Sequence, residues 1–247
     1  MPPSCVVHVG STDGALGVWR DWDVMSAVLV DTDTERLATA QDEIVLAAGK
    51  APHITEAVLA EKVGEAHFYE LSLPLESGLL SAEVLRPFWP GIEDKETRDV
   101  KTVTLDAVVV EGELAPEIRN AWLLLDQFGA ASVLQGGSSL LGNTNLVGVR
   151  MIADDSEISN SRAGDVTEVL EQHGFACIAV VPGNHPKIGY GVFVKDVVGT
   201  AEQTADSERK ELDAVKKSQV DLQKQLADKN YELKSVQSAT DALRAEN

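Results

Sequence analysis

Short apolar runs alternate with segments of helical periodicity through the first 200 residues of this chain, and no other feature restricts its fold as strongly. Ser4–Val9 and Ala27–Val30 are apolar runs of strand length. Thr34–Ala48 then repeats its apolar residues at a helical spacing, and Gly49 stands where a C-terminal cap is expected. Strands that alternate with helices form a mostly parallel sheet with helices on both faces. The sequence therefore predicts a doubly wound α/β sheet that begins with Ser4–Val9.

The same reasoning assigns the remaining elements up to residue 200. The last two apolar runs surround a turn-rich segment, and their pairing is left open between parallel and antiparallel. Gly136 and Gly137 are expected to interrupt one of the helices early. Further strands are expected at Ile54–Leu59, Ala66–Leu71, Val103–Leu105, Ala121–Leu125, Leu146–Ile152, Phe175–Val181 and Tyr190–Val194. Further helices are expected at Gly14–Asp23, Ala130–Leu141 and Val166–His173.

The composition changes near residue 200, which divides the chain into an α/β domain (1–200) and a helical segment (201–247). The second part has neither Gly nor Pro and carries a heptad pattern. The pattern predicts a coiled coil that makes the protein a homo-oligomer through residues 205–245; the alternative is a lone helix or one packed on the domain. It runs to the last residues, which leaves open a longer coiled coil. The core positions are Leu212, Gln219, Leu226, Leu233 and Thr240 at a, and Val215, Leu222, Lys229, Val236 and Leu243 at d.

The chain is strongly acidic, with 40 Asp and Glu against 21 Lys and Arg and a formal net charge of −19. Such a charge argues against nucleic acid or an anionic membrane as a partner. No stretch approaches the roughly 18 apolar residues of a membrane span, and the N-terminus does not resemble a signal peptide. Cys5 and Cys177 are too few for a disulfide framework, and the histidines lack metal-ligand spacing. We expect a cytoplasmic protein without a metal.

A glycine-containing loop follows the first strand, and an acid, Asp31, ends the second. Glycines allow close approach of a ligand, and the acid can accept hydrogen bonds from ribose hydroxyls. The loop has neither a Walker lysine nor a full G-x-G-x-x-G motif, so ATP and NAD are less favoured than S-adenosylmethionine. The expected cofactor-binding residues are therefore Gly10, Ser11, Thr12, Asp13, Gly14 and Asp31.

Segments spread over residues 4–196 resemble, in order, motifs of the FkbM-type S-adenosylmethionine-dependent methyltransferases. An acid after the second strand belongs to the same series. The matching segments are His8–Gly14 for D-V-G-A-N-x-G, Gly64–Tyr69 for G-E-A-x-F-Y, Val103–Asp106 for V-x-T-L-D, Leu124–Ala130 within K-I-D-V-E-G-A-E, and Glu171–Phe175 for L-x-x-x-G-F.

The chain is identified as a divergent member, because several family positions differ. Leu124 replaces a lysine, Phe128 and Ala131 replace acidic or polar residues, and His8 replaces the acid of the first strand. The matching residues are Gly10, Gly14, Asp31, Asp106, Asp126 and Gly129. The resemblance implies a Rossmann-like methyltransferase sheet and O-methylation of a sugar or another small hydroxyl acceptor, in surface-polysaccharide synthesis. The lost charges favour an alternative, a catalytically inactive scaffold or docking module oligomerised by its coiled coil.

Methyl transfer to a hydroxyl needs positioning and a base. Asp126, at the end of a strand, is the best-placed carboxylate, although such an acid can instead cap the following turn. His8 is the second candidate because a histidine titrates near neutrality; on an apolar strand it can instead be a hydrogen-bonded structural histidine. The predicted catalytic residues are thus Asp126 and His8.

Overall fold

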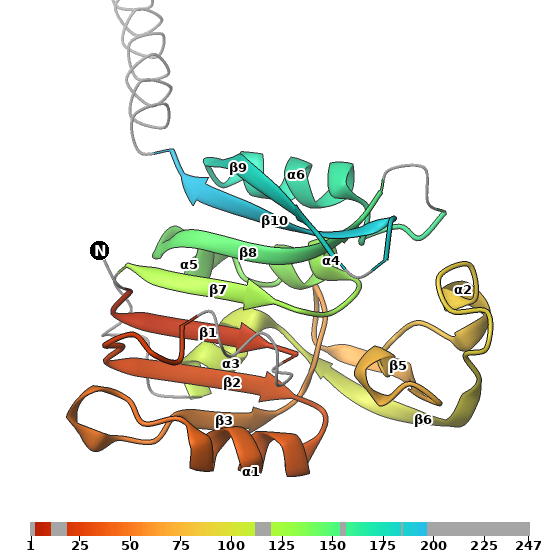
Figure 1. Ribbon diagram of the computed structural model, residues 1–247, viewed down its shortest axis with the longest axis horizontal. Helices are drawn as coiled ribbons and strands as arrows, with labels where there is room; N and C mark the ends of the chain where they lie inside the picture. Colours follow the sequence, from red (N-terminus) through yellow and green to blue (C-terminus); the bar gives the residue numbers. More distant parts are fainter. Residues whose placement is uncertain (1–2, 11–18, 112–119, 154–156, 184, 197–247) are drawn as a thin grey trace, which may run out of the picture. The chain divides into compact units, whose positions relative to one another are not determined.

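The computed structural model describes residues 3–10, 19–111, 120–153, 157–183 and 185–196. Their main feature is a seven-stranded sheet with the order β3-β2-β1-β7-β8-β10-β9, which runs from bottom to top in Figure 1. The predicted coiled coil lies outside the described residues. The strands are β1 (Cys5–Val9), β2 (Ser26–Asp31), β3 (His53–Glu56), β7 (Ala121–Leu125), β8 (Thr144–Ile152), β9 (Phe175–Pro182) and β10 (Ile188–Lys195).

The five strands from β3 to β8 are parallel, and β10 runs antiparallel to both β8 and β9. This confirms the predicted Rossmann-like sheet and resolves the last pair as antiparallel. β1 lies between β2 and β7, and all five of its residues are buried. The strand alternates between two cores: Cys5, Val7 and Val9 belong to one and Val6 to the other.

Helices cover both faces of the sheet. The core that contains Val6 includes Leu37 and Ala40 of α1 (Thr34–Glu43), so this helix covers that face. The opposite core contains residues of four further helices, such as Leu105 and Leu134. These helices are α3 (Leu105–Glu111), α4 (Ala130–Gln135), α5 (Ser138–Gly142) and α6 (Ala163–Gln172).

A second, three-stranded sheet has the order β4-β6-β5, with β5 and β6 antiparallel. In Figure 1, the arrowheads of β1, β2 and β7 point toward it, so it lies beyond the carboxyl ends of these parallel strands. A core cluster that includes Leu71, Leu85, Ile152 and Ile188 packs it against the main sheet. Its strands are β4 (Val58–Leu59), β5 (Gly64–Leu71) and β6 (Asp94–Val103), and two short helices, η3 (Pro74–Glu76) and α2 (Ala82–Leu85), lie between β5 and β6 in the chain.

Some predicted boundaries were wrong. The run Ile54–Leu59 belongs to two sheets, because the chain leaves β3 after Glu56 and enters β4 at Val58. Of the predicted strand Val103–Leu105, only Val103 belongs to a strand, as the last residue of the long β6, and Leu105 already begins α3. The predicted helix Thr34–Ala48 ends at Glu43 and is followed by the short helix η2 (Ala47–Gly49). The break at Gly136 and Gly137 is confirmed, since it separates α4 from α5.

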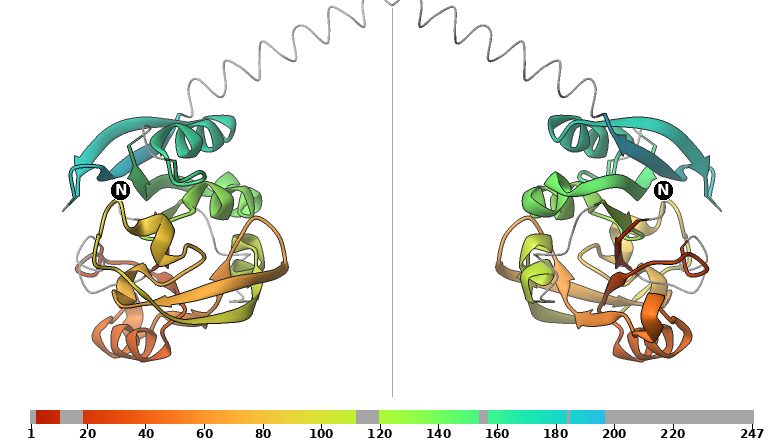
Figure 2. Two further views of the ribbon diagram at one scale, coloured as in Figure 1. Left: turned by 90° about the vertical axis from the view of Figure 1, so that its right-hand side faces the viewer. Right: turned by 90° about the vertical axis from the view of Figure 1, so that its left-hand side faces the viewer.

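Figure 2 shows the same arrangement from two further sides, with the second sheet near the carboxyl ends of the parallel strands. Within the described residues, none of the helices combines the length and the apolar character needed to cross a bilayer.

Candidate functional site

The candidate site is a pocket of about 580 Å³ at the carboxyl ends of β1, β2 and β7. The main sheet contributes Gly10, Asp31 and Asp126 to its wall. The second sheet and η3 contribute the opposite wall, with Phe68 and Glu76 among its residues. The pocket thus lies where the sequence predicted a ligand site, between the strand ends and a segment inserted after β3.

Gly10 occupies a backbone position that only glycine fits. Its φ is +71°, and a Cβ atom at this residue would lie 2.6 Å from the carbonyl oxygen of Asp126. The backbone is fixed on both sides: the N–H of Gly10 donates to the Val30 carbonyl, and the N–H of Asp126 donates to the Val9 carbonyl, both at 2.9 Å. These bonds hold the ends of β1, β2 and β7 together under the pocket.

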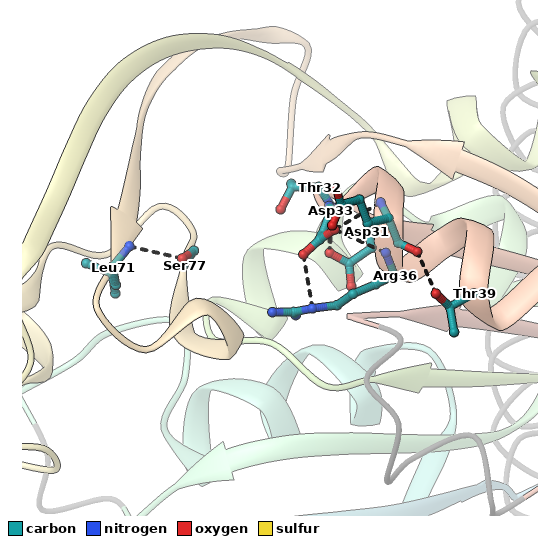
Figure 3. Close-up of polar contacts among 8 residues, drawn as sticks. Asp31, Thr32, Asp33, Arg36, Thr39, Leu71 and Ser77 are labelled. Carbon is teal, nitrogen blue, oxygen red and sulfur yellow. Dashed lines mark hydrogen bonds and ion pairs between the residues drawn. The ribbon is translucent and has the colours of Figure 1, made fainter.

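Asp31 ends β2 and turns the chain into α1. Its Oδ1 accepts hydrogen bonds from the backbone N–H groups of Thr32 at 2.7 Å and Asp33 at 3.0 Å (Figure 3). Among the described residues, no hydrogen bond involves its Oδ2. Burial raises the pKa of Asp31 above its ordinary value, and the two backbone hydrogen bonds oppose this effect. The pocket therefore contains a carboxylate with one oxygen engaged in a turn and the other available as an acceptor.

Asp33 caps the N-terminus of α1. The carboxylate of Asp33 accepts from the backbone N–H groups of Glu35 and Arg36 and forms an ion pair with the Arg36 side chain at 3.1 Å. On the opposite wall, the Ser77 hydroxyl accepts from the Leu71 N–H at 3.0 Å and closes the loop around η3, as Figure 3 shows. Both walls of the pocket are thus fixed by local side-chain-to-backbone bonds.

A largely buried polar cluster comprises Glu76, Asp126, Arg150 and Tyr190, and the first three of these residues line the pocket. Arg150 Nη2 donates to Glu76 Oε1 at 2.9 Å, and Arg150 Nε lies 4.0 Å from Asp126 Oδ1. The Tyr190 hydroxyl donates to Asp126 Oδ1 at 3.1 Å. The side chains of Arg150 and Glu76 are only 10% and 9% exposed. The cluster connects β7, β8 and β10 of the main sheet with η3 of the inserted segment.

The pKa values of the cluster follow from burial and charge. Burial alone lowers the pKa of Arg150, but the hydrogen bond and charge of Glu76, with the charge of Asp126, hold it above its ordinary value. Burial and the negative charge of Asp126 raise the pKa of Tyr190 to about 12. Near neutral pH, Arg150 is therefore charged and Tyr190 is a hydrogen-bond donor.

Phe128 lines the pocket and contacts Arg150. The Arg150 guanidinium lies 4.3 Å from the centre of the Phe128 ring and 5.8 Å from that of Trp89. Such contacts stabilise a cation that is removed from water. Phe128 thus presents an aromatic surface to the Arg150 guanidinium.

His8 lies elsewhere. It is fully buried on β1, its Nδ1 accepts from the Trp19 indole N–H at 3.3 Å, and burial lowers its pKa to about 4. It is not among the residues that line the pocket. Of the two interpretations of His8, this placement supports a hydrogen-bonded structural histidine rather than a base that contacts the acceptor.

The structure brings Gly10, Asp31 and Asp126 into one pocket, as predicted, and their roles stay predictions. Ser11, Thr12, Asp13 and Gly14 lie outside the described residues. The sequence-based prediction missed Glu76, Arg150 and Tyr190. Asp106, which matches a family motif, accepts from the N–H groups of Ser139 and Leu140 and so caps α5. Within the described ranges, no group of three His, Cys, Asp or Glu side chains is arranged to hold a metal ion.

The chain matches no protein-family model and no curated protein sequence. Similar solved structures include magnesium protoporphyrin IX methyltransferase from Synechocystis PCC 6803 with bound SAM, at 12% identity and a TM-score of 0.40, covering 79% of this chain and 71% of that one. Ribosomal protein L11 methylase from Lactobacillus delbrueckii is 12% identical, with a TM-score of 0.38 and coverages of 78% and 71%.

A third similar structure is the N-terminal domain of EvdMO1 with SAH and D-fucose, at 11% identity and a TM-score of 0.37, covering 78% of this chain and 76% of that one. The fold assignment itself rests on the strand order and register. The chain has a Rossmann-like sheet, with an antiparallel strand, β10, inserted between the last parallel strand and the edge.

Proposed function

We propose that this protein is an S-adenosylmethionine-dependent O-methyltransferase that acts on a sugar or another small hydroxyl compound. One observation carries the proposal: Gly10, Asp31 and Asp126, which end three neighbouring parallel strands, line the same pocket. Ligands of doubly wound sheets bind at this end of the strands. Surface-polysaccharide synthesis is the setting that the family resemblance implies.

The residues of the pocket fit this cofactor. Asp31 Oδ2 can accept from the ribose hydroxyls while Oδ1 stays in its turn. Gly10 presents bare backbone to the ligand. The volume of about 580 Å³ is in the range of small-molecule sites. Carboxylates outnumber guanidiniums along the wall, which suits a ligand with a sulfonium and an ammonium. The acids are Asp31, Asp33, Glu35, Glu70, Glu76 and Asp126, and the cations are Arg36, Arg98 and Arg150.

S-adenosylmethionine would supply a methyl group on a positively charged sulfur. The chain would hold the acceptor oxygen in line with that methyl and remove the hydroxyl proton. Asp126 is the carboxylate in the right place to take the proton. Tyr190 and Arg150 fix its orientation, through the hydrogen bond at 3.1 Å and the approach at 4.0 Å.

The same contacts favour the second candidate, a catalytically inactive module. The Tyr190 hydroxyl already donates to Asp126 Oδ1, so this oxygen is engaged inside the protein instead of facing an acceptor. Phe128 further removes a polar group that the family has at this position. In that case, the pocket binds a ligand without catalysis or no longer binds one. The protein then acts as a scaffold that is oligomerised by its predicted coiled coil.

Calorimetric titration of the full chain with S-adenosylmethionine and S-adenosylhomocysteine tests the proposal. Asp31→Asn keeps the Oδ1 acceptor of the turn and replaces Oδ2 with a donor. Losing a hydrogen bond to a charged group costs about 1.5–3 kcal/mol, so we expect affinity to fall by about 10- to 100-fold. Asp33→Asn is the matched control: it removes a charge from the same wall but keeps a good helix cap, and we expect a change below about threefold.

The outcomes separate the two candidates. The enzyme is supported if the wild type methylates sugars and Asp126→Asn lowers the rate of this methyl transfer while it retains the affinity for the cofactor. Cofactor binding without transfer to any of a panel of sugars and small alcohols supports the scaffold. No heat with either ligand at millimolar concentration would rule out the cofactor, and equal affinities for Asp31→Asn and wild type would show that the ribose lies elsewhere.

A further inference from the structure

The η3 loop, which comprises residues 72–81 between β5 and α2, reverses the usual burial of its side chains. The side chain of Glu76 is only 9% exposed, whereas Leu75 and Leu79 are 56% and 37% exposed. A charged residue is rarely buried unless it is paired, and leucine is among the residues that are most often buried. The η3 loop therefore turns a carboxylate toward the interior and leaves its leucines exposed.

Fixed contacts hold the η3 loop in this orientation. Arg150 Nη2 donates to Glu76 Oε1 at 2.9 Å, and the side chains of both residues are at least nine-tenths buried. The backbones of Tyr69 and Gly78 form two hydrogen bonds, at 2.8 Å and 3.1 Å, that close the loop. A rotation that buried Leu75 would draw Glu76 away from Arg150 and leave a buried charge without its partner, which is strongly destabilising. The ion pair thus keeps the neighbouring leucines exposed.

The exposed leucines face the pocket. Leu75 and Leu79 both line it, together with Phe68, Pro74 and Leu80, which belong to β5 and the η3 loop. These five residues form an apolar wall. Apolar surface in contact with water is unfavourable, and a ligand that covers it gains affinity roughly in proportion to the area covered. The apolar wall therefore suits a ligand that has an apolar group of its own.

Of the two ligands of the proposed reaction, the cofactor has another surface for its adenine. The N–H of Ala57 donates to the Asp31 carbonyl at 3.1 Å, and residues 57–59, all apolar, line the pocket beside the proposed ribose-binding acid. The η3 loop lies across the pocket from Asp31, as Ser77 shows in Figure 3. Its Glu76 is connected through Arg150 to the Asp126 end of the pocket, where the acceptor is expected. The acceptor is therefore the ligand that the apolar wall faces.

We propose that the acceptor is amphiphilic: its hydroxyl-bearing end lies at Asp126, and an uncharged apolar group, alkyl or aryl, covers Leu75 and Leu79. This inference rests on the proposed function and adds to it the chemical class of the acceptor. The reversed burial of Glu76 and its neighbouring leucines along one wall of the pocket carries it. A purely hydrophilic sugar would leave these leucines in contact with water.

Glucosides with and without an apolar group test the inference by binding alone. Hexyl β-D-glucoside and methyl β-D-glucoside carry the same sugar and no charge, and they differ only in the length of the alkyl chain. Calorimetric titration of the full chain, saturated with S-adenosylhomocysteine, measures both affinities. Each CH2 group removed from water strengthens binding by about fourfold, so we expect hexyl glucoside to bind about 10- to 50-fold more tightly. Phenyl β-D-glucoside, titrated in the same way, shows whether an aryl group is preferred to an alkyl group.

Leu75→Gln makes the apolar wall polar at an exposed position. Leu75 is about half exposed, so we expect the preference for hexyl over methyl glucoside to fall by about fivefold. The affinity for S-adenosylhomocysteine should change by less than about twofold. Leu73→Gln is the matched control, because Leu73 is 39% exposed in the same loop but does not line the pocket. Melting temperatures should show that both variants fold.

The outcomes distinguish this inference from the proposed function. If S-adenosylhomocysteine gives no heat, the proposed function fails. If S-adenosylhomocysteine binds but neither hexyl nor phenyl glucoside binds more tightly than methyl glucoside, the inference alone is overturned. It is also overturned if Leu75→Gln leaves the preference for the apolar glucoside unchanged. A loss of S-adenosylhomocysteine affinity in Leu75→Gln but not in Leu73→Gln would show that the cofactor covers the apolar wall, contrary to the inference.

Discussion

The buried histidine predicts how the stability of the protein changes in mild acid. His8 is fully buried on the central strand, and burial lowers its pKa from 6.5 to about 4. The unfolded chain therefore binds a proton at higher pH than the folded chain does. The stability that His8 contributes is complete above pH 6.5 and is lost as the pH falls toward 4. Across the whole interval, a pKa shift of this size changes the free energy of unfolding by about 3.4 kcal/mol.

Between pH 7 and pH 5, linkage gives a loss of about 2 kcal/mol from this group alone. His8→Gln should remove that loss, because glutamine does not titrate and still offers an oxygen to the Trp19 indole N–H. The measurement is the free energy of unfolding in urea at both pH values, for wild type and variant. We expect the wild type to lose about 2 kcal/mol more than His8→Gln on acidification.

His53→Gln, which changes an exposed histidine of β3, serves as the control. We expect the stability of this variant to depend on pH as that of the wild type does. The carboxylates are the same in every variant, so their contribution to the pH dependence of stability cancels in the comparison. Equal losses for wild type and His8→Gln would refute the reasoning, since they would mean that the folded protein accommodates a charged His8 as easily as water does.

Two further predictions concern the pocket. Gly10→Ala places a Cβ against the carbonyl oxygen of Asp126 at positive φ, so we expect a loss of about 1–3 kcal/mol in urea unfolding together with loss of cofactor heat in calorimetry. Glu76→Leu leaves the buried Arg150 without its hydrogen-bonded partner and should cost about 3–5 kcal/mol, whereas Glu83→Leu, at an exposed position of α2, should cost under about 0.5 kcal/mol.

The main sheet was predictable because its strands are buried on both faces. Strands such as Cys5–Val9 and Ala121–Leu125 appear in the sequence as short runs in which almost every residue is apolar, His8 being the exception in the first. β6 has no such pattern: most of Asp94–Val103 is exposed and charged, and its pairing with β5 holds it in place. Apolar periodicity therefore identified only its last residue.

The candidate site was predictable where a pocket residue ends or follows a recognisable strand, as Gly10, Asp31 and Asp126 do. Glu76 and Arg150 gave no such indication. Arg150 lies inside β8, and Glu76 lies in the inserted segment, so their ion pair joins distant parts of the sequence. Only the fold brings the two charges together, and neither has a local motif that indicates its partner.

The central place of β1 has a consequence for folding during synthesis. Cys5 pairs with Ser26 on one side and with Ala121 on the other, so about half of the chain separates β1 from its second neighbour. Parallel pairing over such a distance is slow, because the loop must close before contacts form. While the ribosome makes the intervening residues, β1 and β2 can meet, but the other edge of β1 has no partner. The nascent protein is thus an incomplete sheet whose fully buried strand is still open on one side.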